Sequence, residues 1–177
     1  MRRGELERLG IQLPVLPTIV LGALPGPPDW AVALERAGLD VIASGAASDT
    51  PATWAAAREA VPHRLVKATA GSAGELSAAG AVVIESAGEV PEGCYRLGPD
   101  EVLAPAVRGD APRAEDPNEV AEAVLRAADL HGAAAVWVAA TPGLEGHEPE
   151  LVKAKVRALV EGARLARLLL AKHQFDD

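Results

Sequence analysis

The C-terminal part of the chain pairs a short apolar run with a long amphipathic helix. Residues 133–140 contain only alanine, valine and tryptophan, which is typical of a strand that is buried on both faces. After a turn at residues 141–146, apolar side chains recur at helical spacing from Val152 to Leu170, without an intervening proline. A buried strand followed by such a helix is half of a β/α unit, so the pattern predicts a parallel sheet covered by helices.

The same alternation recurs in weaker form along the rest of the chain. Strands are expected at residues 18–23, 39–44, 64–69, 81–85 and 133–140, with short ones near 94–97 and 102–107. Helices are expected at residues 29–37, 50–61, 72–80, 116–131 and 150–172. Elements that alternate at this spacing favour parallel pairing. We therefore expect an α/β fold with a long C-terminal helix, built either as a doubly wound sheet or as a reduced or partial (β/α) TIM-type barrel.

The ends of several helices are marked by residues that suit them. Thr50 and Asp116 can each accept a hydrogen bond from the first turn of a helix, and each is followed by proline at the first helical position. Gly38 is well placed to end the helix at residues 29–37, because glycine adopts the left-handed conformation at little cost. These three signals support the expected helix boundaries.

The length and composition of the chain suit one globular domain. With 177 residues, of which 49% are hydrophobic, the chain can bury a core, and we expect one α/β domain over residues 1–177. Residues 1–12 are expected to form a flexible arm or a short helix. The net charge of −8 argues against a nucleic-acid surface, because such a surface needs clustered lysine and arginine.

Two further patterns bear on location. Cys94 is the only cysteine, so the chain cannot form an internal disulfide, and nothing suggests secretion. The apolar run from Val15 to Leu24 is broken by Pro17, which fits neither a signal peptide nor a membrane span. We therefore expect a cytoplasmic protein that binds neither membranes nor nucleic acids.

Three stretches resemble the catalytic barrel of cobalamin-independent methionine synthase, within the superfamily that includes uroporphyrinogen decarboxylase. Residues 18–25 (TIVLGALP) are similar to the family's opening strand, which ends in Ile-Gly-Ser-Phe-Pro. Residues 76–85 (LSAAGAVVIE) resemble the helix and strand that end in its Asp-Glu-Pro motif. Residues 136–144 (VWVAATPGL) resemble its last strand, where the family has Asn-Pro-Asp-Cys-Gly-Leu. The resemblance implies a barrel, although the chain has about half the length of a complete one.

The chain departs from this family at the residues that would bind zinc. The family activates a thiol on zinc, and such a catalytic site needs about three protein ligands. The family's last-strand cysteine falls on Pro142, and its serine after the first strand falls on Ala23. Its His-x-Cys-Tyr pair falls on residues 92–95, which keep Cys94 and lack the histidine. The resemblance therefore implies shared ancestry, and we expect neither an intact zinc site nor another cofactor.

Cys94 and Glu85 are the candidate catalytic residues. Cys94 is interpreted either as a nucleophile or remnant metal ligand, or as a small buried apolar residue. Glu85 ends an expected strand, at the edge where the active sites of barrels lie. The family resemblance implies that an acidic residue there binds a substrate ammonium group. Glu85 is equally consistent with the first solvated residue after the strand.

Lys67 and Asp40 join Glu85 as candidate substrate-binding residues. Lys67 lies within an expected strand, and a buried lysine whose pKa is lowered by desolvation can form a Schiff base. The favoured interpretation is that Lys67 pairs with a neighbouring carboxylate such as Asp40 or Glu85.

Two functional hypotheses follow from these residues. The first is a shortened methionine-synthase-like barrel protein without zinc chemistry, acting as a binding or partner subunit. A sheet that does not close leaves edges that need covering, so we expect a homo-oligomer or a protein partner, together with a small-molecule ligand. The second is methyl or alkyl transfer to a small thiol, with zinc, at a rearranged site that includes Cys94, Glu85 and Glu92.

Overall fold

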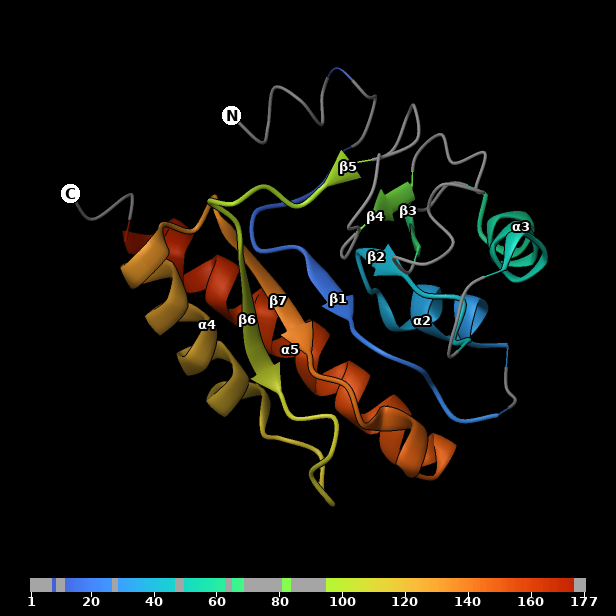
Figure 1. The fold of residues 1–177 in the computed structure, drawn as a ribbon. Coiled ribbons are helices and arrows are strands. Elements are labelled where there is room, and N and C mark those ends of the chain that lie inside the picture. Colours follow the sequence, from blue (N-terminus) through green and yellow to red (C-terminus); the bar gives the residue numbers. More distant parts are fainter. Residues whose placement is uncertain are drawn as a thin grey trace.

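The structure is a computed structural model that describes residues 8, 12–26, 29–46, 50–62, 65–68, 81–83 and 95–173. Its strands are β1 (Thr18–Val20), β2 (Val41–Ile42), β3 (Leu65–Ala68), β4 (Ala81–Val83), β5 (Tyr95–Arg96), β6 (Val102–Val107) and β7 (Val136–Ala140). Its helices are α2 (Trp30–Ala37), α3 (Pro51–Ala60), α4 (Pro117–His131) and α5 (Pro149–His173), with a 3-10 turn at Leu144–Gly146. Figure 1 shows how these elements are arranged.

The described strands form one parallel sheet in the order β5-β4-β3-β2-β1-β7-β6. β1 lies between β2 and β7, the last strand, and β6 lies on the far side of β7. The first and last strands are also neighbours in a (β/α) barrel. A doubly wound sheet would instead continue with rising strand numbers. Within the described ranges no pairing joins β5 to β6. The described strands therefore follow the strand order of a barrel, with an opening between β5 and β6. The expected α/β fold with parallel strands and a long C-terminal helix is confirmed.

The larger core fills the space between the sheet and the helices. Alternate strand residues, including Val20, Ile42 and Val138, belong to this core and are fully buried. Helices α4 and α5 lie side by side along the β6 and β7 part of the sheet (Figure 1). Full burial of one such side chain contributes about 1.5–3 kcal/mol, so this layer is the main source of stability.

Helices α4 and α5 approach each other closely at Gly162. A Cβ atom at this position would lie 2.3 Å from Val120 Cγ1 and 2.9 Å from the carbonyl oxygen of Pro117. Glycine inside a helix costs about 1 kcal/mol relative to alanine. The close approach of α4 explains why α5 carries glycine here despite that cost.

The other face of the sheet carries a second, smaller core. Its buried members are Ile19, Val41, Tyr95, Trp137 and Ala139. The rings of Tyr95 and Trp137 are stacked, with centroids 6.4 Å apart and planes inclined by 19°. Glu101 accepts hydrogen bonds from both rings and directly precedes β6. The aromatic cluster therefore lies at the amino ends of β6 and β7. We call this side the inner face, since it corresponds to the interior of a barrel.

The helix ends confirm the capping predictions. Thr50 Oγ1 accepts a hydrogen bond of 3.2 Å from the amide of Thr53, and the carboxylate of Asp116 accepts one of 2.7 Å from the amide of Asn118. Gly38 ends α2 with a φ of 86°. In each case a short polar side chain or a glycine satisfies main-chain groups that the helix leaves unpaired.

The strand lengths differ from those expected. β1 and β2 are shorter than the sequence predicts, whereas the short strand expected at residues 102–107 has the predicted bounds. Proline argues against a central strand, but Pro105 is compatible with β6 because β6 lies at the edge of the sheet. The predicted helix at residues 72–80 and most of the predicted arm at residues 1–12 lie outside the described residues. No helix in the described ranges has the length and apolarity that a bilayer crossing requires.

Candidate functional site

The loops after β6 and β7 meet at the carboxyl ends of the strands. The amide of Gly109 donates a hydrogen bond of 2.9 Å to Thr141 Oγ1, and the amide of Thr141 donates one of 2.9 Å to the carbonyl oxygen of Val107. A Cβ atom on Gly109 would lie 2.0 Å from the carbonyl oxygen of Thr141. The close packing therefore requires glycine and brings the two loops into one surface.

Lys155 of α5 forms hydrogen bonds with the loop that follows β6. Its side chain is fully buried, and its ammonium donates hydrogen bonds of 2.9 Å and 2.6 Å to the carbonyl oxygens of Arg108 and Arg113. Glu115 Oε2 lies 3.4 Å from the same ammonium, while Glu115 Oε1 accepts a 2.9 Å hydrogen bond from the amide of Arg108. A buried lysine is tolerated when a carboxylate and carbonyls surround it, so Lys155 holds residues 108–115 in place.

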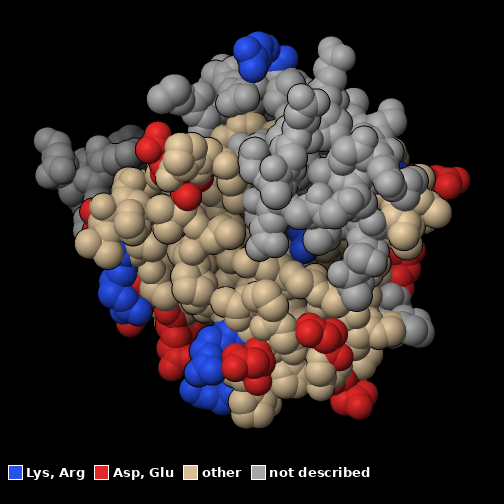
Figure 2. Space-filling model, in the orientation of Figure 1, with Lys and Arg blue, Asp and Glu red and all other residues tan. Residues whose placement is uncertain are grey.

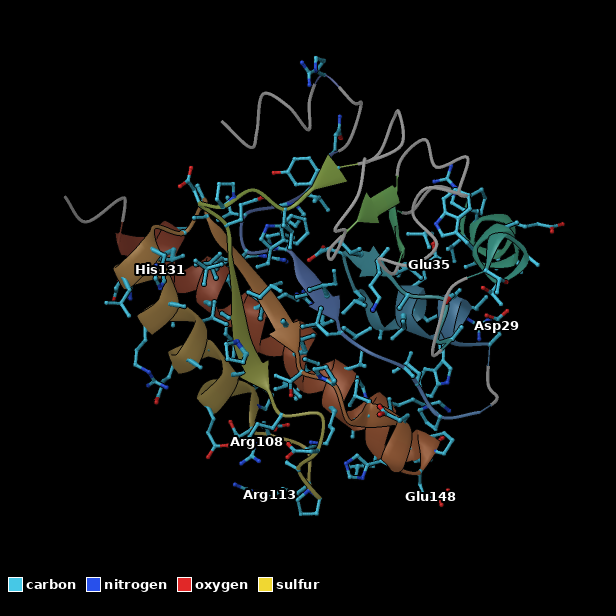
Figure 3. The ribbon with its side chains drawn as sticks, in the orientation of Figure 1. Asp29, Glu35, Arg108, Arg113, His131 and Glu148 are labelled. Carbon is cyan, nitrogen blue, oxygen red and sulfur yellow. The ribbon has the colours of Figure 1, made fainter. Side chains whose placement is uncertain are left out.

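Arg108 and Asp110 form an ion pair on the surface of this loop. Arg108 donates two hydrogen bonds to the Asp110 carboxylate, at 3.3 Å and 3.0 Å. The hydrogen bond and the attraction between the opposite charges lower the pKa of the Asp110 carboxyl and raise that of the Arg108 guanidinium. Figure 3 places Arg108 and Arg113 together beyond β6, with His131 at the other end of α4. In Figure 2 charged groups gather at this end of the molecule.

The loop after β7 also contacts the segment that follows β1. Gly22 has a φ of 74°, and a Cβ atom there would lie 3.1 Å from Pro142 Cβ. The two stretches that resemble family motifs, residues 18–25 and 136–144, are thus brought together by the pairing of β1 with β7. Nearby in sequence, His147 Nε2 is buried without a hydrogen-bond partner. A polar atom in that state is one that a ligand or a water would satisfy.

Lys67 lies on β3, where 7% of its surface is exposed. Its neighbour Val66 belongs to the core under the helices, so alternation along the strand directs Lys67 to the inner face. In the sheet Lys67 pairs with Val82 of β4. Glu85, three residues beyond Val82, lies outside the described residues, as does Cys94. Their predicted roles therefore stay predictions.

Asp40 lies at the opposite end of the sheet, directly before β2. Its carboxylate accepts hydrogen bonds of 2.9 Å and 2.8 Å from the amide and hydroxyl of Thr18, and one of 2.6 Å from Arg167. Arg167 also donates to the carbonyl oxygens of Val15 and Leu16. These contacts give Asp40 a structural role in joining β1, β2 and α5. None of these contacts joins Asp40 to Lys67. The predicted part of Asp40 in ligand binding therefore has no support from this geometry.

Potential metal ligands are not clustered in the part of the chain that the structure describes. Within those residues no group of three or more histidine, cysteine, aspartate or glutamate side chains is placed to hold a metal ion. Cys94, Glu85 and Glu92 lie outside that part. The described residues alone therefore supply no site with the three protein ligands that a catalytic zinc ion needs.

Sequence reasoning missed two residues that the structure shows to be important. Lys155 could have been found from its spacing, because it lies three residues after Val152 and four before Leu159, on the apolar face of α5. Glu101 accepts hydrogen bonds from Tyr95, Trp137 and the amide of Gly98. No sequence signal marks Glu101, since its partner Trp137 lies 36 positions away along the chain.

Comparison with known proteins yields a distant structural likeness. No family model and no curated protein matches the sequence. Among solved structures, the chain is similar to a B12-independent methionine synthase from a Shewanella species, solved in complex with selenomethionine. The two share 15% sequence identity with a TM-score of 0.39, over 78% of this chain and 51% of that chain. This chain thus spans about half of that enzyme, and the likeness concerns the arrangement of helices and strands alone.

Proposed function

We propose that this protein is a binding or partner subunit, a shortened methionine-synthase-like barrel that has lost the zinc chemistry of its relatives. The observation that carries the proposal is the opening between β5 and β6. Residues 97–101, which connect these strands, are too few for the helix that normally joins successive parallel strands. An open sheet edge of this kind is normally covered by another chain or segment.

A hollow surface supports the same function. A groove of about 370 Å³ runs beside β6, lined mainly by residues 102–106 of the strand and by Ala123, Ala127 and Leu130 of α4. Leu130 is 79% exposed. Exposed apolar surface beside an edge strand is typical of an interaction site. Lys67 on the inner face and the unpaired His147 Nε2 support the binding of a small ligand as well.

Light scattering after size-exclusion chromatography tests the proposal. We expect the purified chain to elute with a mass above the 18.2 kDa of one copy, or to be driven to a larger mass by a specific protein partner. A monomer at high concentration that binds no partner would contradict a role as a partner subunit.

Metal analysis separates this function from the alternative, methyl or alkyl transfer to a small thiol. That reaction would need zinc to lower the pKa of the thiol. Bound zinc at one ion per chain, lost in the variant Cys94→Ala, would support the transferase. Purified protein that neither holds zinc nor takes it up on dialysis would support the binding subunit.

A further inference from the structure

The groove beside β6 lies where a closed barrel would have another helix. In a (β/α) barrel each strand is followed by a helix on the outside of the sheet. Here the chain passes from β5 to β6 through residues 97–101 alone, so no helix comes between these strands. One flank of α4 packs against α5, and the other flank, with Ala123 and Ala127, borders the groove. The groove therefore has the position and the lining of a helix-binding surface.

Resting on the proposed function, we infer that helix α4 of a second copy of this chain fills the groove, giving a two-fold symmetric dimer. Such an interface is isologous, which means that each α4 serves both as the occupant and as part of the groove. Ala123 and Ala127 are small, so the two helices can approach closely, and Leu130 supplies the exposed apolar side chain. All three lie on one face of α4 because they are spaced by four and three residues.

Charge complementarity selects this occupant. Glu122 and Arg126 are exposed on α4 and stand one turn apart, with 3.8 Å between Arg126 Nη1 and Glu122 Oε2. A two-fold axis that crosses α4 at the level of Val124, its middle residue, makes the two helices antiparallel. It places Arg126 of each copy beside Glu122 of the other. The helix is thus complementary to itself, as a symmetric contact requires.

Direct pairing of two β6 strands is disfavoured by the sequence of the strand itself. The amide of Val102 donates to Ala135, so alternation turns the main-chain groups of Leu103 and Pro105 towards the open side. Proline has no amide hydrogen, so Pro105 removes one of the donors that an added strand would need. A helix, whose main-chain hydrogen bonds are internal, meets no such obstacle.

Charge reversal with rescue tests the dimer on the full chain. We expect the wild type to approach twice 18.2 kDa in a concentration-dependent manner. Glu122→Arg and Arg126→Glu should each weaken the dimer by about tenfold or more, because like charges then meet across the axis. The double variant should restore the dimer. Arg164→Glu, which changes an exposed charge of α5 to the same extent, serves as the control.

Leu130→Asp provides a second, independent measurement. Because Leu130 is largely exposed, this variant should keep the circular dichroism spectrum of the wild type and lose the dimer. An assembly that persists in Leu130→Asp and in both charge reversals would overturn the α4 interface and leave the partner-subunit role standing. A wild type that is monomeric but binds an unlike partner would overturn the dimer in the same way. A wild type that does neither would overturn both proposals.

Discussion

The ammonium of Lys155 donates a 2.9 Å hydrogen bond to the carbonyl oxygen of Arg108, from the second turn of α5 to the loop that follows β6. The two residues are 47 positions apart, and the lysine is fully buried. A charge in such a place is stable only while its partners are present. The conformation of residues 108–115 therefore depends on one side chain of α5.

Replacing that lysine tests this dependence. Lys155→Met keeps the apolar stem and leaves the carbonyl oxygens of Arg108 and Arg113 without their donor. We expect the free energy of unfolding to fall by roughly 2–4 kcal/mol, since buried acceptors lose their hydrogen bonds. Urea unfolding measures the loss. Lys153→Met, which breaks the surface pair with Glu150, should cost less than about 1 kcal/mol. Equal losses would refute the role of Lys155.

Glu101 joins the two stacked aromatic rings of the inner face. Glu101→Ala removes the acceptor of the Tyr95 hydroxyl and of the Trp137 indole. We expect a destabilisation of roughly 2–4 kcal/mol, because the Tyr95 hydroxyl and the Trp137 indole both lose their hydrogen bond to this carboxylate. The fluorescence emission of Trp137 should shift in the folded protein. Replacing Trp30 and Trp54 isolates this emission. An unchanged emission spectrum would mean that this contact does not form in solution.

Gly162 reports on the contact between α4 and α5. In an isolated helix, alanine would be more favourable than glycine by about 1 kcal/mol. In this fold the added methyl group would meet Val120 of α4 at 2.3 Å. We expect Gly162→Ala to lower the free energy of unfolding by about 1–3 kcal/mol, the usual cost of overpacking. Thermal unfolding shows whether the variant is less or more stable than the wild type. A stabilised variant would show that α4 lies farther from α5.

The hydrogen bonds at the first turn of α4 predict that the stability of the fold decreases in acid. Hydrogen bonds from the amide and side chain of Asn118 lower the pKa of the Asp116 carboxyl. Because the folded-state pKa lies below the unfolded one, the stabilisation is complete above about pH 4 and is lost as the pH falls through the folded pKa.

Asp116→Asn keeps a capping side chain that cannot ionise. The melting temperature of the wild type should exceed that of the variant at neutral pH, and the difference should shrink in acid. A difference that does not change with pH would contradict the predicted shift. Carbon-13 NMR of the Asp116 carboxyl gives its pKa directly.

Much of this fold could be predicted from local patterns in the sequence. The capping residues Thr50 and Asp116 and the helix end at Gly38 were identified correctly because their signals depend only on near neighbours. The strand order and the position of the opening between β5 and β6 could not be predicted, because they depend on contacts between distant segments. Asp40 shows the same limit, since its partner Arg167 lies 127 positions away.

The open edge at β6 is the basis of both proposals, and amide hydrogen exchange of the dilute protein tests it most directly. The amide of Leu103 faces the open side, while that of Val102 is bonded to Ala135 of the adjoining segment. We predict fast exchange at Leu103 and strong protection at Val102. Strong protection at Leu103, with nuclear Overhauser contacts from β6 to Tyr95 and Arg96 main-chain atoms, would show that the sheet closes into a barrel.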